Sequence, residues 1–172
     1  FVAFEVFLSA YNLDQQQEYY IKTFDVNAIC YLDIGFILFG EDYKRGEFLV
    51  NMSKEHKNAG NNCGSELADH LPNMLNLLNV SEDKEMVKEL AYCLMIPALK
   101  EMILSFKNES NVYRNALNIV VKVLEKDFED ESLEQFNITR KTDDCFTGKG
   151  GMKGHSCGMN KRTENGFIAN PN

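Results

Sequence analysis

The stretch GSELADHLPNML, residues 64–75, contains the clearest helix start in the sequence. The apolar positions that follow Asp69 recur at helical spacing: Leu71, Met74, Leu75 and Leu78. Aspartate is preferred at a helix N-cap because its carboxylate accepts a free backbone N–H, and Pro72 is tolerated in a first turn. These signals predict a helix capped by Asp69. No cap requires His70, which makes it a candidate functional residue.

Helical periodicity recurs over most of the chain before residue 129, whereas hairpin signals do not. Residues 28–39 are apolar nearly all round and predict a buried helix. Pro97 lies inside another apolar run, where it predicts a kink or a helix break. His56, on a charged helix face, is expected to be solvated. The sequence predicts an all-α fold, a single bundle of about six helices over residues 1–128.

Residues 129–172 lose this periodicity and become rich in Gly, Lys and Asn, which predicts a flexible C-terminal tail. Cys145, His155 and Cys157 in this tail are zinc-ligand types. Their spacing matches no common zinc knuckle, and no fourth ligand is evident, so no metal site is predicted.

The charge of the chain is acidic, with 18 Lys and Arg against 26 Asp and Glu. Six of the basic and three of the acidic residues lie in 140–172, so residues 1–139 carry −11 and the tail +3. An acidic surface repels phosphates, which argues against nucleic-acid binding and suits a basic partner or simple solvation. Five cysteines without a paired framework predict a reducing, cytoplasmic location. The longest apolar stretches are too short to cross a membrane.

Three segments resemble one protein family. ELADHLP (66–72) resembles the E-L/P-x-D-H-x-P signature of the NarJ/TorD superfamily, the chaperones that mature molybdenum enzymes. YYIKTFD (19–25) and LFGEDYKRGEFLVNM (38–52) resemble two further segments of that family, in the same order along the chain. The resemblance covers about residues 4–128. The helix that opens such proteins is absent or truncated here, and the tail has no counterpart.

The resemblance implies a dedicated chaperone of the nitrate reductase delta-subunit type, not an enzyme. Its partner would be the basic, apolar N-terminal peptide of the apo catalytic subunit of a molybdopterin oxidoreductase. The client, not the chaperone, would carry the bis-molybdopterin guanine dinucleotide and an iron–sulfur cluster. The expected peptide-binding residues are Tyr20, Phe24, Phe39, Tyr43, Arg45, Glu66, Asp69 and His70. Gly46, Leu71 and Pro72 are expected to be structural members of the motifs.

Two other functions fit parts of the sequence. A small metal-dependent hydrolase would use Glu66, Asp69 and His70, but it needs a further ligand and a base. A permanent structural subunit of an oxidoreductase complex is the third interpretation. Within the chaperone hypothesis, Asp69 caps its helix while His70 and Glu66 face the peptide cleft. The alternative for His70 is a core histidine bonded to a backbone carbonyl.

Overall fold

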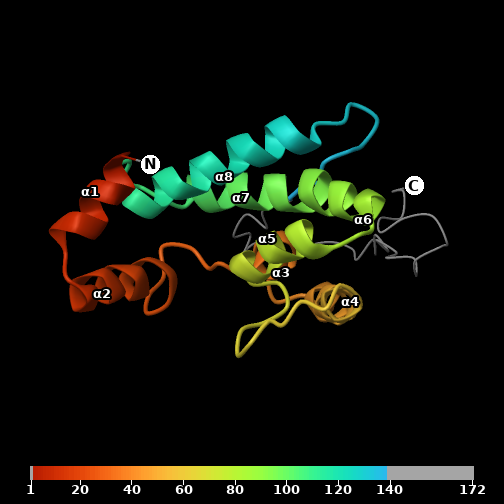
Figure 1. Ribbon diagram of the computed structural model, residues 1–172, viewed down its shortest axis with the longest axis horizontal. Coiled ribbons are helices and arrows are strands. Elements are labelled where there is room, and N and C mark those ends of the chain that lie inside the picture. The colour runs from red at the N-terminus through yellow and green to blue at the C-terminus, as the bar shows by residue number, and fades with distance from the viewer. Residues whose placement is uncertain (1, 139–172) are drawn as a thin grey trace, which may run out of the picture.

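The computed structural model describes residues 2–138, which form helices joined by turns and short irregular segments (Figure 1). In chain order the helices are α1 (Val2–Ala10), α2 (Leu13–Phe24), α3 (Ile34–Phe39), α4 (Tyr43–Asn58), α5 (Leu71–Val80), α6 (Lys84–Glu89), the π-helix η1 (Leu90–Met95), α7 (Ile96–Leu104) and α8 (Val112–Phe128). Because α6, η1 and α7 follow one another without a break, residues 2–138 contain seven separate helical segments. The predicted all-α class is confirmed.

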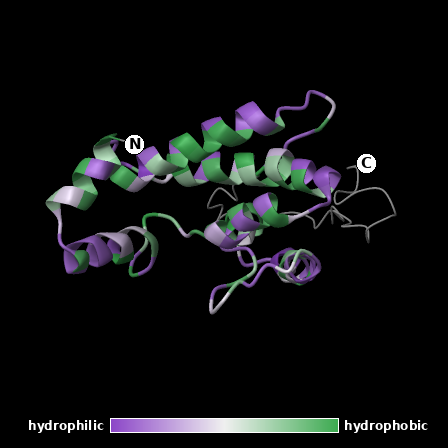
Figure 2. Ribbon diagram, viewed as in Figure 1, coloured by the Kyte–Doolittle hydropathy of each residue, from purple (hydrophilic) through white to green (hydrophobic). Residues whose placement is uncertain are grey.

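The core lies where α7 and α8 pack side by side and α3 packs against α4, η1 and α7. The α7 ribbon is mostly apolar, whereas α2 is largely hydrophilic on the side seen in Figure 2. The large apolar side chains with less than 2% exposure are Phe48, Ile34, Met52, Met74, Leu77, Leu90, Met95, Ile96, Leu99 and Met102. Within the described part of the chain, no helix has the length and apolarity needed to cross a bilayer.

The predicted buried helix over residues 28–39 is only half right, because α3 begins at Ile34. The residues before it pair with the segment that precedes α5. The N–H of Leu71 donates to the Leu32 carbonyl at 2.9 Å, and the N–H of Ile34 donates to the Asp69 carbonyl at 2.9 Å. An isolated antiparallel bridge between Asp33 and His70 marks this pairing. Tertiary pairing therefore overrides the local apolar pattern.

The helix continues through Pro97, where a kink or break was predicted. The preceding turn widens into η1, in which the N–H of Ile96 donates to the Ala91 carbonyl five residues earlier. Such π turns are rare and occur mostly as single turns inside α-helices. Pro97 is the second residue of α7, so the widened π turn lies directly before the residue that has no N–H to donate.

The packed body extends past residue 128, the predicted domain boundary. α8 ends at Phe128, but Leu133, Phe136 and Ile138 beyond it pack against the core. These residues belong to the body rather than to a flexible tail. The rest of the predicted tail, including Cys145, His155 and Cys157, lies outside the described residues.

Aromatic rings attach α1 and α2 to the body. Tyr113, in the first turn of α8, is their shared contact. The rings whose centroids lie 4.9–6.4 Å from that of Tyr113 are Phe4, Phe7, Tyr19, Tyr20 and Phe24. Each such pair is worth about 0.5–1.5 kcal/mol beyond simple burial.

Tyr113→Ala is therefore expected to lower the free energy of unfolding by about 2 kcal/mol and to loosen α1 and α2 more than α7. Denaturant unfolding measures the first effect, and hydrogen exchange of the two helices measures the second. Tyr43→Ala is the matched control, because the Tyr43 side chain is 72% exposed. Equal protection of α1 in Tyr113→Ala and in the unmutated protein would contradict the role of Tyr113 as the anchor.

Candidate functional site

Asp69 caps α3, and not α5 as the sequence predicted. Its side chain is fully buried, and its Oδ2 accepts the N–H of Gly35, in the first turn of α3, at 3.1 Å. Asp33 stands at the N-cap of α3 but makes no capping hydrogen bond with its side chain. Asp69 thus supplies the missing acceptor from a segment 34 residues away.

The prediction that α5 is capped by Asp69 is wrong because the backbone pairing turns this carboxylate toward α3. His70 occupies the N-cap of α5 instead, without a side-chain cap bond, and Leu71 is the first helical residue. Pro72 lies exposed in the first turn, where proline is tolerated. Leu71 is buried, so both motif residues have structural roles.

Arg45, near the start of α4, links the two aspartates. Its Nη2 lies 3.4 Å from Asp33 Oδ2, and its Nε lies 3.6 Å from Asp69 Oδ2. The guanidinium carbon also stands 5.3 Å from the centroid of the Phe36 ring, a cation–π contact. On the other side of Asp33, His70 Nδ1 lies 3.4 Å from Oδ1. We call Asp33, Arg45, Asp69 and His70 the polar cluster.

Within the polar cluster, the surroundings of Asp69 act on its pKa in opposite directions. Burial raises the pKa of Asp69, and the nearby Asp33 carboxylate raises it further, while Arg45 and the Gly35 N–H oppose the shift. Asp69 Oδ1 and Arg45 Nε are buried atoms without a hydrogen-bond partner in the described chain. Buried polar atoms usually have partners, so the cluster retains hydrogen-bonding capacity on both an acceptor and a donor.

No protein-family model, curated protein or solved structure matches this chain.

Tyr20, on α2, lies in the neighbourhood of the polar cluster. Its ring lies 5.1 Å from Phe24 and its side chain is 38% exposed. Burial, followed by the charges of Glu66, Asp25 and Asp33, raises the pKa of the Tyr20 hydroxyl. Tyr20 therefore shares its surroundings with exposed Glu66 and with a member of the polar cluster.

The other predicted site residues are divided between the interior and the surface. Phe24 is buried, and Phe39 is half-buried with its ring 5.6 Å from Phe48. Tyr43 is exposed at the first position of α4. Gly46 is exposed one residue beyond Arg45, and nothing lies within 4 Å of where a Cβ would stand. The structure thus brings together Tyr20, Arg45, Glu66, Asp69 and His70, whereas the Phe24 and Phe39 rings serve packing.

His56 is a polar residue whose environment was predicted wrongly. It is 2% exposed, not solvated. Its Nε2 donates to the Ala68 carbonyl at 2.8 Å, and its Nδ1 accepts the Asn61 amide at 2.8 Å. His56 follows Phe48 and Met52 at four-residue steps, so the helical stripe was a signal for burial. The ring ties the loop before Asp69 to α4.

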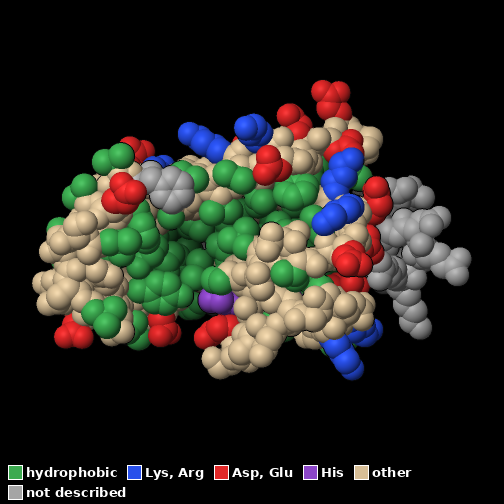
Figure 3. All heavy atoms as spheres, viewed as in Figure 1, with side chains coloured by type: hydrophobic (Ala, Val, Ile, Leu, Met, Phe, Trp, Pro, Cys, Tyr) green, Lys and Arg blue, Asp and Glu red, His purple; other side chains and the backbone are tan. Residues whose placement is uncertain are grey.

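A broad apolar area occupies the centre of the face shown in Figure 3, hollowed between the α1–α2 end and the rest of the molecule. A histidine and an acidic side chain lie at its lower border. Large exposed apolar side chains are concentrated in residues 2–31: Val2, Val6, Leu8, Tyr11, Leu13, Tyr20, Ile21, Val26, Ile29 and Tyr31. Apolar surface of this kind, bordered by polar groups, is typical of interaction sites.

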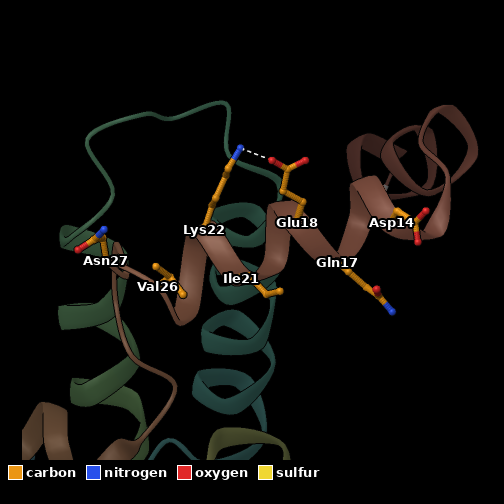
Figure 4. Close-up of a pocket in the computed structure, with 7 residues that line it drawn as sticks. All are labelled: Asp14, Gln17, Glu18, Ile21, Lys22, Val26 and Asn27. Carbon is orange, nitrogen blue, oxygen red and sulfur yellow. Dashed lines mark hydrogen bonds and ion pairs between the residues drawn. The ribbon is translucent and has the colours of Figure 1, made fainter.

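Two shallow hollows lie elsewhere. Along α2 and the turn after it, Ile21 and Val26 form an apolar floor beside Glu18 and Lys22, which are joined by a 2.6 Å ion pair (Figure 4). The other hollow, of about 560 Å³, lies between α4 and the loop that carries Glu66. Among residues 2–138, no group of three His, Cys, Asp or Glu side chains is placed to hold a metal ion.

Proposed function

We propose that this chain is an assembly chaperone of the NarJ/TorD kind. It would bind the N-terminal peptide of the apo catalytic subunit of a molybdopterin oxidoreductase. The observation that carries the proposal is the meeting of two motif segments. Arg45 belongs to the segment 38–52, and Asp69 and His70 belong to the segment 66–72. Arg45 lies beside Asp69, and His70 contacts Asp33, so these residues from two segments meet in the polar cluster. Tyr20 from the first segment shares an acidic environment with Glu66.

The physical task would be recognition of an amphipathic helix. The peptide's apolar face would occupy the apolar area of Figure 3, as helices enter grooves in other peptide complexes. Its basic residues would pair with the carboxylates of Glu66, Asp25 and Asp33 around Tyr20. The net charge of −11 over residues 1–139 would speed and orient the encounter.

The chaperone role assigns the cofactor chemistry to the client. The client would receive its bis-molybdopterin guanine dinucleotide and iron–sulfur cluster while this chain holds the peptide, in the cytoplasm and before assembly or export. This chain would supply reversible binding alone.

Titration calorimetry with a synthetic peptide of the client's N-terminal sequence tests the proposal. Glu66→Gln and His70→Ala are each expected to weaken binding about tenfold, which corresponds to loss of one charge-assisted contact. Their melting temperatures should stay close to that of the unmutated protein. Glu82→Gln is the matched control, because Glu82 is also exposed but precedes α6, and it should bind normally.

Three outcomes would contradict the proposal or part of it. If the unmutated protein binds no N-terminal peptide of a molybdoenzyme, the proposed chaperone function is wrong. A His70→Ala variant with a lower melting temperature and unchanged affinity would make His70 structural. Co-purification of the chain with the mature enzyme complex would indicate a permanent subunit instead.

A further inference from the structure

Pro97 leaves a helical carbonyl without its usual partner. In an α-helix the N–H of residue 97 would donate to the carbonyl of Cys93, but proline has no N–H. The Phe136 N–H, from the segment that follows α8, donates to this carbonyl at 2.8 Å. The Cys93 carbonyl, to which Pro97 cannot donate, is thus the acceptor on which a distant segment docks.

We call residues 129–138 the strap. Leu133, Phe136 and Ile138 are partly buried against the core, and Asp130 forms an ion pair with Lys88 of α6. Lys88 and the hydroxyl and N–H of Ser132 hold the pKa of the Asp130 carboxyl far below its usual range. The carboxylate is thus ionised at neutral pH, where the ion pair is fully formed.

A continuous series of contacts runs from the strap to the polar cluster. The Phe136 ring lies 5.3 Å from Phe39, at the C-terminal end of α3, and Phe39 lies 5.6 Å from Phe48. Phe48 is fully buried and its Cδ1 lies 2.8 Å from where a Cβ on Gly35 would stand. Gly35 is the residue whose N–H Asp69 accepts. α3 is therefore held by Asp69 at one end and by the strap at the other.

We infer that the strap is a releasable latch that holds α3 in place, so that its docking and the integrity of the polar cluster are coupled. The two ends of α3 make the coupling direct, because a helix of six residues moves as one unit. By reciprocity, any ligand that tightens the polar cluster also favours the docked strap. The inference stands apart from the proposed function, since it concerns α3 and the strap whatever the cluster binds.

Few contacts hold the strap, which is why it can open without unfolding the bundle. Within the described chain, the bond from Phe136 to Cys93 is the one backbone hydrogen bond between the strap and the rest of the molecule. The ion-paired side chains of Lys88 and Asp130 are 39% and 19% exposed. Segments with few buried contacts open locally at a smaller free energy than global unfolding.

Hydrogen exchange of the full chain tests the latch. Leu133→Ala combined with Phe136→Ala removes two apolar anchors, and the amides of the strap and of α3, Gly35 included, should exchange about tenfold faster. Glu134→Ala combined with Gln135→Ala is the matched control, because both side chains are exposed in the same segment. It should leave both rates unchanged, and α5 should be unaffected in either variant.

Faster exchange of the strap with unaltered exchange of Gly35 would overturn the coupling. If the double substitution prevents folding, Lys88→Ala provides a milder release, since it removes only the ion pair with Asp130. In Lys88→Ala, hydrogen exchange of the strap amides and of the α3 amides should become faster together. Unchanged strap exchange in Lys88→Ala, or faster strap exchange alone, would equally overturn the latch.

Discussion

Asp69→Ala is expected to lower the free energy of unfolding by about 3–5 kcal/mol, the range found when one partner of a buried ion pair is removed. The change leaves the Gly35 N–H without an acceptor at the start of α3. It also leaves the Arg45 guanidinium, whose side chain is 23% exposed, with Asp33 as its remaining anionic contact. Denaturant unfolding monitored by circular dichroism measures the loss.

A matched aspartate separates this tertiary role from ordinary capping. Asp42, which is half-buried, caps α4 locally by accepting the Lys44 N–H at 3.1 Å. Asp42→Ala should lower the free energy of unfolding by about 1 kcal/mol, as the loss of an N-cap usually does. Similar losses for the two variants would contradict the assignment of Asp69 as a tertiary cap.

The pH dependence of the unmutated protein provides an independent check on Asp69. Because its pKa is raised above the ordinary value of 3.8, the folded state binds this proton more tightly than the unfolded state. The contribution of Asp69 to stability is therefore largest at low pH and falls as the pH rises through the raised pKa. Asp69→Asn, which keeps an amide oxygen for Gly35, should remove this slope and lose less stability than Asp69→Ala.

The helices could be predicted from sequence because their signals are local. Periodic apolar residues and the polar breaks between them specify helix and bundle before any tertiary contact is known. Caps were harder to place even locally. Two capping-type residues, Asn12 and Asp14, stand near the start of α2, and Asn12 is the cap: its side chain accepts the Gln15 N–H, and the Gln15 side chain accepts the Asn12 N–H.

The sequence indicated which residues belong to the candidate site better than it indicated how they contact one another. Arg45, Asp69 and His70 lie together, but their partners follow from pairing between residues 32–34 and 69–71, which no local pattern encodes. The docking of Phe136 on Cys93 has the same origin. Each depends on which distant segment reaches an unsatisfied backbone group, and sequence spacing alone does not specify that segment.

Gly35→Ala tests the close packing of α3 against Asp69 and Phe48. A Cβ at this position would stand 2.7 Å from Asp69 Oδ2 and 2.8 Å from Phe48 Cδ1, inside van der Waals contact with both. Phe48 is fully buried and has no room to yield, so the added methyl group must displace α3 or the Asp69 carboxylate. Overpacking together with loss of the cap should lower the free energy of unfolding by about 3 kcal/mol.

Gly46→Ala is the matched control for Gly35→Ala, because both glycines lie in helices but only one is enclosed. Nothing lies within 4 Å of the Cβ position at Gly46, which is exposed on α4. Alanine there should raise the free energy of unfolding by about 0.5–1 kcal/mol, since glycine is the poorer helix former. The two substitutions should therefore act in opposite directions in the same unfolding experiment. A destabilised Gly46→Ala would contradict the open surroundings of this glycine, and an unaffected Gly35→Ala would contradict the close packing of α3 against Asp69 and Phe48.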